Sequence, residues 1–355
     1  MDSPEAFSAR LSDSTLAFLE VLTLYIGDRL GLYAALGEGG PATSTELAAR
    51  TGTHERYVRE WLEQQAACGV LEVDSREATA QARRYRMSPG HAEVLVNRES
   101  LHYQAARPKS LLAVARRLPL VLEAFRTGGG VSGEDAEARE AQAELGRVRF
   151  LRLLGAAWLP AVPDVQARLL AEPGARVADL GCGGGWSAIA LARAYPHARV
   201  DGFDIDAPSI ALARKNAEEA GVADRVRFFA RDAADPSLAG RYDLALAFET
   251  LHDMPRPVEA LATMRRLTGD AGAVIVADEK VSEEFQAPAD PNTRTGYGWS
   301  VLSCLSSAMV GEKAAGTGAV MRPSVFEGYA RAAGFRAVEV LPIEDDLLRF
   351  YRLRG

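Results

Sequence analysis

The stretch RVADLGCGGGWSAIALARAY, residues 176–195, decides the fold of this 355-residue chain. Residues 176–181 have the apolar pattern of a buried strand, and residues 185–195 have that of a helix. Glycines at 181 and 183–185 join the two. Because glycine has no Cβ and readily adopts positive φ, such a turn is tight and can approach a ligand closely. A strand, a glycine-rich turn and a helix in this order are typical of nucleotide-binding α/β folds.

The same alternation of strand and helix continues beyond this turn. We expect further strands at 199–204, 225–230, 242–248 and 273–278, and a helix from Pro208 to Ala220. After a long insertion, a helix at 324–333 precedes two last strands, AVEVLPI and LLRFYRLR. Strands alternating with helices predict a doubly wound, mostly parallel sheet of seven strands, with ligands at the carboxyl ends of the strands.

The chain before residue 155 is mainly helical in pattern. Residues 14–36 predict one long apolar helix, and PATSTELAARTG predicts a short helix capped by Thr43 or Ser44 and ended by Gly52. An amphipathic helix ending at Gly69 and two short strands, VLEVD and RYRMSP, complete the order of a winged helix. The predicted parts are a winged-helix domain at 1–90, a helical linker or lid at 91–165 with a flexible glycine run at 128–130, and an α/β domain at 166–355 with an insertion near 283–322.

Composition restricts the function classes. With 41 Lys and Arg against 48 Asp and Glu, the net charge is −7, which disfavours a nucleic-acid partner. The cysteines, Cys68, Cys182 and Cys304, form no CxxC pair, which argues against a zinc ribbon, a dithiol redox site and a disulfide scaffold. No apolar run reaches the ~20 residues that a bilayer span needs, and no signal peptide is recognisable. We expect a soluble cytoplasmic protein.

Three carboxylates accompany the strands around the glycine turn. Asp204 ends the second strand nineteen residues after Gly185, close to the offset of an acid that holds a ribose diol. Asp232 and Ala233 follow the third strand, where they can meet an adenine through a carboxylate and a backbone N–H. Asp179 lies just before the glycines and can balance an ammonium group. The alternatives are a turn or helix cap for Asp204 and a loop cap for Asp232.

A dinucleotide dehydrogenase is the nearest competing interpretation. Counted from Gly181, the third glycine of GxGxxG would be Trp186, which is too bulky for the close helix–strand contact. Counted from Gly183, the motif GxGxxA is complete, so the motif alone does not exclude NAD. The charge of Asp179 would repel a pyrophosphate, and the sequence has no GxxxxGK[ST] P-loop.

Asp179-Leu180-Gly181-Cys182-Gly183-Gly184-Gly185, Asp204 and Asp232 resemble the class I S-adenosylmethionine (SAM)-dependent methyltransferases over residues 165–355. The pattern GLYAAL…ELAARTG…YVREWLEQQAACGVLE is similar to bacterial small-molecule methyltransferases with an N-terminal winged helix. The resemblance implies a Rossmann-like strand order of 3-2-1-4-5-7-6 with the last strand antiparallel, SAM as cofactor and S-adenosylhomocysteine as product. It also implies that the winged helix mediates homodimerisation and is not used to bind DNA. No membrane partner is expected, because no apolar run is long enough to span a bilayer. The cofactor-binding positions that it implies are Asp179, Gly181, Gly183, Gly185, Asp204, Ile205, Asp232, Ala233 and Phe248.

The segment FETLHDMPR, residues 248–256, contains our proposed catalytic base. The imidazole of His252, with an ordinary pKa near ~6.5, can take a proton from a hydroxyl or amine. The segment resembles the LHDW stretch of small-molecule O-methyltransferases, in which the histidine is the general base, although Met254 replaces the tryptophan. Asp278 or Glu279 can orient the imidazole, or serve only as strand-end carboxylates. The alternative for His252 is a packing role against the cofactor loop.

The insertion at 284–311 is expected to line the acceptor pocket through Tyr297, Trp299, Ser300 and Cys304, unless it serves only helix packing. No catalytic metal is expected, because no histidine follows His252 to complete a two-histidine site. The expected function is SAM-dependent methylation of a small molecule, with oxygen favoured over nitrogen or carbon, in specialised metabolism.

Two interpretations from other classes stay open. One is a DNA-binding regulator, supported by the winged helix and by arginines in its wing, and opposed by glutamates on the helix that would read the groove. The wing arginines are Arg76, Arg83, Arg84 and Arg86, and the glutamates are Glu55, Glu60 and Glu63. The other is a methyltransferase fold that binds SAM without turnover.

Overall fold

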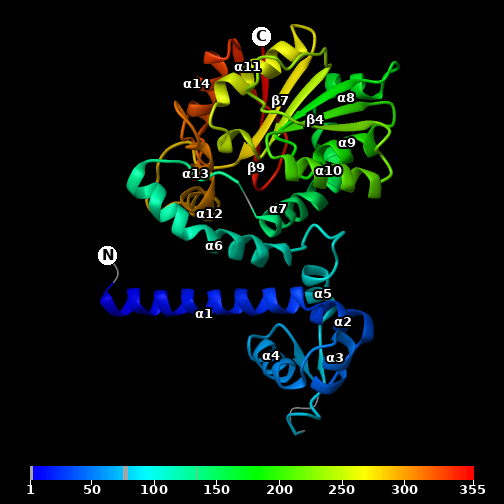
Figure 1. Cartoon of the computed structure of the whole chain (residues 1–355), viewed down its shortest axis with the longest axis vertical. Coiled ribbons are helices and arrows are strands. Elements are labelled where there is room, and N and C mark those ends of the chain that lie inside the picture. The colour runs from blue at the N-terminus through cyan, green and yellow to red at the C-terminus, as the bar shows by residue number, and fades with distance from the viewer. Residues whose placement is uncertain (1–2, 75–78, 134) are drawn as a thin grey trace. The chain divides into compact units, whose positions relative to one another are not determined.

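The computed structural model describes residues 3–74, 79–133 and 135–355 (Figure 1). The chain forms two compact units, one ending at Leu112 and the other running from Ala113 to Gly355. The sequence predicted three parts, with boundaries after residues 90 and 165. Whether each of those parts folds independently stays a prediction. Among the described residues, no helix combines the length and the apolar character that crossing a membrane requires.

The first unit is a winged helix, as the sequence predicts. Thr43 caps α3 in a full capping box, in which Glu46 Oε2 accepts from the Thr43 backbone N–H at 2.9 Å. Gly52 ends α3 with a φ of 64°. Strands β1 and β2 pair antiparallel as the wing. The elements are α1 (Pro4–Arg29), α2 (Leu32–Gly39), α3 (Ser44–Thr51), α4 (Glu55–Ala67), β1 (Glu72–Val73), β2 (Tyr85–Arg86), α5 (Pro89–Leu95) and α6 (Ala106–Thr127), which continues into the second unit.

The single helix predicted at 14–36 is wrong, because two helices occupy this region. α1 begins earlier, at Pro4, and ends at Arg29, and α2 begins at Leu32. Gly31 lies between them with a φ of 67°, a left-handed conformation that interrupts the helical ladder and that glycine adopts at little cost. Only Gly27 of α1 is buried, and an added Cβ there would lie 2.4 Å from the Tyr33 ring and 2.5 Å from Trp61. The C-terminal end of α1 therefore packs on the domain core.

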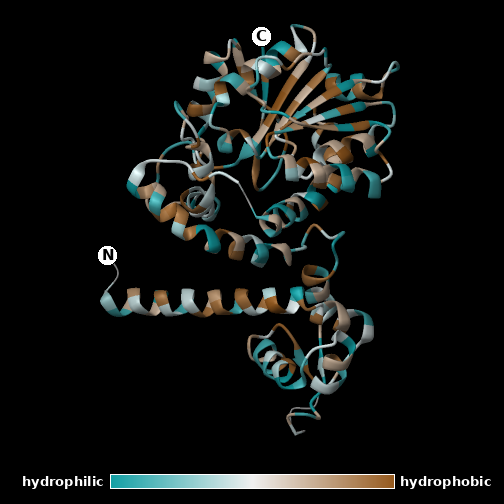
Figure 2. Cartoon of the chain, viewed as in Figure 1, coloured by the Kyte–Doolittle hydropathy of each residue, from teal (hydrophilic) through white to brown (hydrophobic). Residues whose placement is uncertain are grey.

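The second unit holds a seven-stranded sheet in the order β5-β4-β3-β6-β7-β9-β8, which confirms the predicted 3-2-1-4-5-7-6. All pairs are parallel except β7–β9 and β8–β9. The apolar central strands run as a brown band in Figure 2. The strands are β3 (Arg176–Leu180), β4 (Arg199–Asp204), β5 (Val226–Ala230), β6 (Leu244–Phe248), β7 (Ala273–Glu279), β8 (Ala337–Val340) and β9 (Leu348–Arg354).

Helices cover both faces of this sheet and bury two apolar layers. The layer that includes Ile189 packs α8, α9 and α10 on one face, and the layer that includes Phe326 packs α11 and α14 on the other. The helical elements are α7 (Ala136–Arg149), the π-helix η1 (Phe150–Trp158), α8 (Pro163–Leu170), α9 (Trp186–Ala194), α10 (Ala207–Glu219), the 3-10 turn η2 (Leu251–Asp253), α11 (Pro257–Thr268), α12 (Pro291–Trp299), the π-helical turn η3 (Ser300–Cys304), α13 (Leu305–Ala308) and α14 (Pro323–Ala332).

Gly130, the last residue of the glycine run at 128–130 that was predicted to be flexible, packs against the insertion after β7. An added Cβ on Gly130 would lie 2.4 Å from the backbone nitrogen of Val310, so only glycine fits. The next residue, Val131, donates its N–H to the Ser306 carbonyl at 2.9 Å. This contact joins the helical segment before the sheet to the insertion that was expected to line the acceptor pocket.

Candidate active site

The glycine turn after β3 has the geometry that its sequence predicts. Gly181, Gly183 and Gly185 have φ values of 71°, 48° and 80°, a region that disfavours residues with a Cβ. An added Cβ would lie 2.2 Å from Thr250 Oγ1 at Gly181 and 2.6 Å from the Phe228 ring at Gly185, whereas at Gly183 it would meet open space. The outer glycines are thus required by packing, and the middle one leaves the turn open to a ligand.

Asp204 lies directly beside this turn. One of its oxygens accepts from the Gly183 N–H at 2.8 Å and the other from the Asp206 N–H at 2.9 Å. Burial raises the pKa of Asp204. Sequence reasoning missed Arg139 of α7, whose Nε lies 2.6 Å from Asp206 Oδ2. This ion pair places α7 beside the residues that follow Asp204. No local motif marks that arginine.

Asp179 is the second carboxylate at the turn and is only 1% exposed. Its Oδ2 accepts from Ser187 Oγ at 2.5 Å. Burial, opposed by this hydrogen bond and reinforced by the negative charge of Asp204, raises the pKa of Asp179 to about 6. A cation placed at this turn would favour the ionised form, whereas a pyrophosphate would face two carboxylates.

Asp232 and Ala233, predicted to contact adenine, follow the carboxyl end of β5, and Ile205, predicted to bind the cofactor, follows that of β4. Asp232 Oδ1 accepts from the Ala234 N–H at 2.8 Å, which is the loop-cap role, and its Oδ2 pairs with Arg256 Nη2 at 2.5 Å. Sequence reasoning missed Arg256. Ile205 is 72% exposed, and Ala233 is buried. The carboxylate of Asp232 is therefore already paired with the Arg256 guanidinium at this edge of the sheet.

Phe248 has a different environment from the other predicted cofactor residues. Its ring stacks on Phe150 with a centroid distance of 5.9 Å and meets Trp158 edge-on at 6.3 Å. Only 7% of Phe248 is exposed, within the apolar layer that includes Ile189. The structure brings it into the core behind the site.

His252 and Asp278, predicted as partners, form a buried pair. His252 lies in η2 directly after β6, and Asp278 lies near the end of the neighbouring strand β7. Their Nδ1 and Oδ1 atoms are 2.5 Å apart, and His252 is 3% exposed. Burial alone would lower the pKa of His252, but the charges of Asp278 and Asp253 raise it well above its ordinary value. The carboxylate fixes the orientation of the ring and leaves Nε2 for another partner.

Further acidic groups surround this pair. Burial and the charge of Glu249 raise the pKa of Glu279, the other predicted partner of His252, to about 8. Glu249 has a φ of 52°, and its Oε1 lies 3.9 Å from Arg149 Nη1. Arg149 also pairs with Asp345 at 2.6 Å. Sequence reasoning missed Arg149, Glu249 and Asp345, because their proximity depends on the tertiary fold.

Of the four predicted acceptor-side residues, Cys304 reaches the histidine. His252 Nε2, Asp253 Oδ1 and Cys304 Sγ all lie within 4.8 Å of one another. Tyr297 accepts from Arg322 Nη2 at 3.0 Å through its hydroxyl. Ser300 is buried, and Trp299 is partly exposed. The insertion thus brings one predicted residue to the His252–Asp278 pair.

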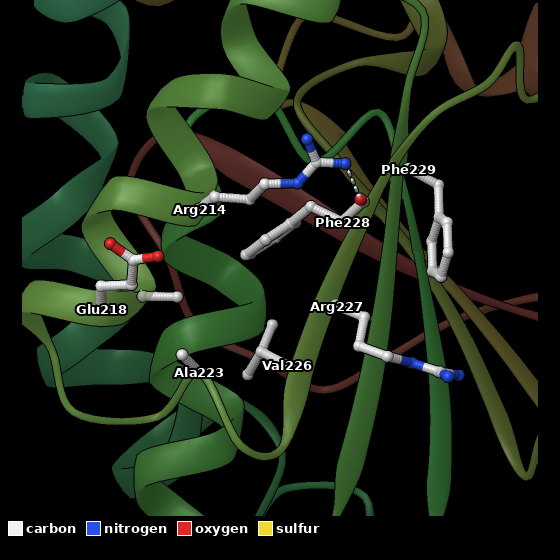
Figure 3. Close-up of a pocket in the computed structure, with 8 residues that line it drawn as sticks. Arg214, Glu218, Ala223, Val226, Arg227, Phe228 and Phe229 are labelled. Atoms are coloured by element: carbon white, nitrogen blue, oxygen red, sulfur yellow. Dashed lines mark hydrogen bonds between the residues drawn. The ribbon is translucent and has the colours of Figure 1, made fainter.

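A hollow of about 320 Å³ lies elsewhere, between α10 and the edge strand β5 (Figure 3). Arg214 crosses it and donates to the Phe228 carbonyl at 2.7 Å. None of the predicted site residues lines it. The hollow is a surface groove at the sheet edge, separate from the glycine turn.

The arginines of the wing are paired with acids in the described part of the chain. Arg83 contacts Glu63 at 2.9 Å, and Arg84 contacts Glu46 at 3.0 Å. Arg86 contacts both Glu72 and Asp74. Arg76 lies outside the described residues. Neighbouring carboxylates reduce the positive potential that phosphate binding needs.

Two families match the chain. Residues 171–313 match the family described as "Methyltransferase domain", and residues 17–97 match the "Rv2258c-like winged HTH domain". The chain therefore carries a methyltransferase domain preceded by a winged-helix domain. These two matches agree with the glycine turn, the strand order and the wing.

Individual proteins with similar sequences or structures carry methyltransferase names. A ubiquinone biosynthesis O-methyltransferase of Burkholderia thailandensis is 29% identical over 178 residues, which cover 50% of this chain and 70% of that protein. The mitomycin 7-O-methyltransferase MmcR superposes with a TM-score of 0.72 at 21% identity, covering 99% of this chain and 98% of its own. Human N-acetylserotonin methyltransferase in complex with SAM superposes with a TM-score of 0.71 at 19% identity. The superposition covers 100% of this chain and 99% of that protein's chain. At these identities the two structures show a shared fold.

Proposed function

We propose that this chain, a SAM-dependent methyltransferase of small molecules with an N-terminal winged-helix domain, methylates a hydroxyl oxygen and uses His252 as the general base. The observation that carries the proposal is the buried contact of 2.5 Å between His252 Nδ1 and Asp278 Oδ1. This contact leaves Nε2 as the ring atom that exchanges a proton with the acceptor. The O-methyltransferases among the similar proteins support oxygen as the acceptor atom, with nitrogen and carbon as alternatives.

The residues at the glycine turn fit SAM. Gly183 faces open space, and Asp179 and Asp204 flank the turn with carboxylates that match a cationic ligand. We assign Asp204 to the ribose, Asp232, Ile205 and Ala233 to the adenine side, and Asp179 to the charge of the amino-acid part. Bound SAM supplies an electrophilic methyl group and leaves as S-adenosylhomocysteine.

The chain's own residues then carry the proton. Because Asp278 and Asp253 raise the pKa of His252, the ring first loses a proton to solvent, and its neutral Nε2 then takes the hydroxyl proton as the acceptor oxygen forms its bond to the methyl carbon. Asp278 stabilises the imidazolium through Nδ1–H and keeps the ring in place. Because in-line positioning supplies much of the rate of methyl transfer, the insertion at 284–311 and Glu279 are assigned to acceptor placement.

Replacement of the base tests this function. His252→Ala should lower kcat by roughly 10²–10⁴, because general-base catalysis contributes about that factor. SAM affinity, measured by calorimetry, should stay near that of the wild type. Asp278→Asn should lower kcat while leaving SAM affinity unchanged, because it removes only the group that orients the ring. Unchanged turnover in His252→Ala, with an acceptor that the wild type methylates, would remove the base role.

We also propose a homodimer in a reducing cytoplasm. Leu11, Leu16, Phe18 and Leu19 of α1 are between 50% and 56% exposed, which is a large apolar surface for a single helix. All three cysteines are free thiols. Light scattering should give twice the chain mass, and replacement of both Leu16 and Leu19 by Glu should give the single mass. A monomeric wild type at micromolar concentration would contradict the dimer.

A further inference from the structure

Three metal-ligating groups converge at Nε2 of His252, the ring nitrogen opposite the Asp278 contact. They are His252 Nε2, Asp253 Oδ1 and Cys304 Sγ, all within 4.8 Å of one another. The first two come from η2 and the third from η3, about fifty residues later in the chain. Imidazole nitrogen, carboxylate oxygen and thiolate sulfur are the three ligand types that zinc binds in proteins.

The spacing of the three atoms is close to that of a tetrahedral site. Zinc bonds of about 2.0–2.3 Å place neighbouring ligand atoms roughly 3.3–3.8 Å apart. His252 Nε2 and Asp253 Oδ1 are already 3.6 Å apart. Bringing Cys304 Sγ into bonding distance requires an approach of about 1 Å or less, within the reach of a small side-chain rotation.

Two further observations point to a ligand at this place. Asp253 Oδ1 is buried and makes no hydrogen bond of ordinary geometry, and His252 Nε2 lies 3.6 Å from it. The other ring nitrogen of His252 is held by Asp278 at 2.5 Å, as in sites where a carboxylate orients a metal-bound histidine. One ligand atom thus lacks an ordinary hydrogen bond, and another already has its supporting group.

We propose that His252, Asp253 and Cys304 form a binding site for a divalent cation of the zinc class. Neutral imidazole, one carboxylate and one thiolate balance the two positive charges, and the thiol proton and the proton on Nε2 leave to solvent when the cation binds. Three protein ligands leave a fourth position for water. This ligand set contains one histidine, whereas the sequence-based argument against a metal considered only sites with two histidines.

The cation also has a consequence for turnover, which rests on the proposed function. A metal bonded to Nε2 occupies the lone pair that would accept the acceptor's proton. Bound zinc therefore inhibits methyl transfer. The site acts as an inhibitory switch at the base, and no metal is needed for the reaction.

Cobalt(II) titration of the full chain without SAM tests the site directly. The wild type should develop one equivalent of a cobalt–thiolate charge-transfer band, and added zinc should remove it. Cys304→Ser should abolish the band, whereas Cys68→Ser, the matched control in the winged-helix domain, should keep it. Asp278→Asn should weaken cobalt affinity roughly 10–100-fold, because it removes the group that orients the histidine. Absence of the band in the wild type, or its persistence in Cys304→Ser, would overturn the site.

Two additional measurements guard against misfolding and separate the two proposals. Asp253→Asn keeps the thiol and should weaken zinc binding measured by calorimetry, while thermal unfolding and SAM binding report that each variant is folded. Unchanged zinc affinity in a folded Asp253→Asn variant would also overturn the site. Zinc that binds at this cluster without slowing turnover would leave the site standing and would refute Nε2 as the base.

Discussion

The cofactor side and the acceptor side of this domain are built differently. Around the glycine turn, the main groups come from consecutive strand ends, and the Gly183 backbone N–H donates to the Asp204 carboxylate at 2.8 Å. Around His252, the groups come from β7, η2 and η3, which are far apart in the chain. The main groups of the cofactor side can therefore be located from the order of the strand ends, whereas those of the acceptor side are brought together only by tertiary packing.

Of the substitutions that test this comparison, Gly181→Ala is expected to have the largest effect on SAM binding and stability. In Gly181→Ala, the added Cβ would lie 2.2 Å from Thr250 Oγ1 in a backbone with a φ of 71°, so the turn must move. Positive φ alone costs about 1–3 kcal/mol in a residue with a Cβ. We expect loss of measurable SAM binding and a lower thermal unfolding temperature. Gly183→Ala is the control for stability, because it has similar backbone strain with nothing within 4 Å, so its unfolding temperature should fall less. Its Cβ would enter the space assigned to SAM, so SAM binding does not separate the two variants. Equal losses of thermal stability would show that steric contact does not shape the turn.

A smaller effect concerns the charge of Asp179. Its pKa is raised to about 6 by burial, so it is mostly protonated at pH 5 and mostly ionised at pH 7. Because a cationic ligand prefers the ionised form, SAM affinity should rise with pH, by roughly 10-fold between pH 5 and 7 for one linked proton. Calorimetry in matched buffers measures this slope. Asp179→Asn should bind SAM more weakly at pH 7 and lose the slope, and a slope that survives in the variant would assign it to another group.

The sequence predicted the sheet well because its signals are local. The apolar runs at 176–181 and 273–278 and the glycines between strand and helix specify elements without reference to distant residues. The break at Gly31 was missed, since the apolar pattern continues through it and only the left-handed backbone separates α1 from α2. The packed state of Gly130 could not be foreseen either, because its neighbour, Val310, belongs to another part of the chain.

The same distinction applies to the site. Asp179, Asp204 and Asp232 were found from their positions at or just after strand ends. Arg139, which pairs with Asp206, and Arg256, which pairs with Asp232, carry no motif. Cys304 was singled out only as a residue of the insertion. Its place beside His252 follows from how η3 packs on η2, which sequence spacing does not encode.

Calorimetric titration of the wild-type chain with S-adenosylhomocysteine, SAM and NAD tests the central claim, a glycine turn between carboxylates that fits a sulfonium nucleoside. We expect one site per chain for SAM and for S-adenosylhomocysteine, weakened in Asp204→Asn, and no binding of NAD. Binding of NAD without binding of either nucleoside would contradict the account.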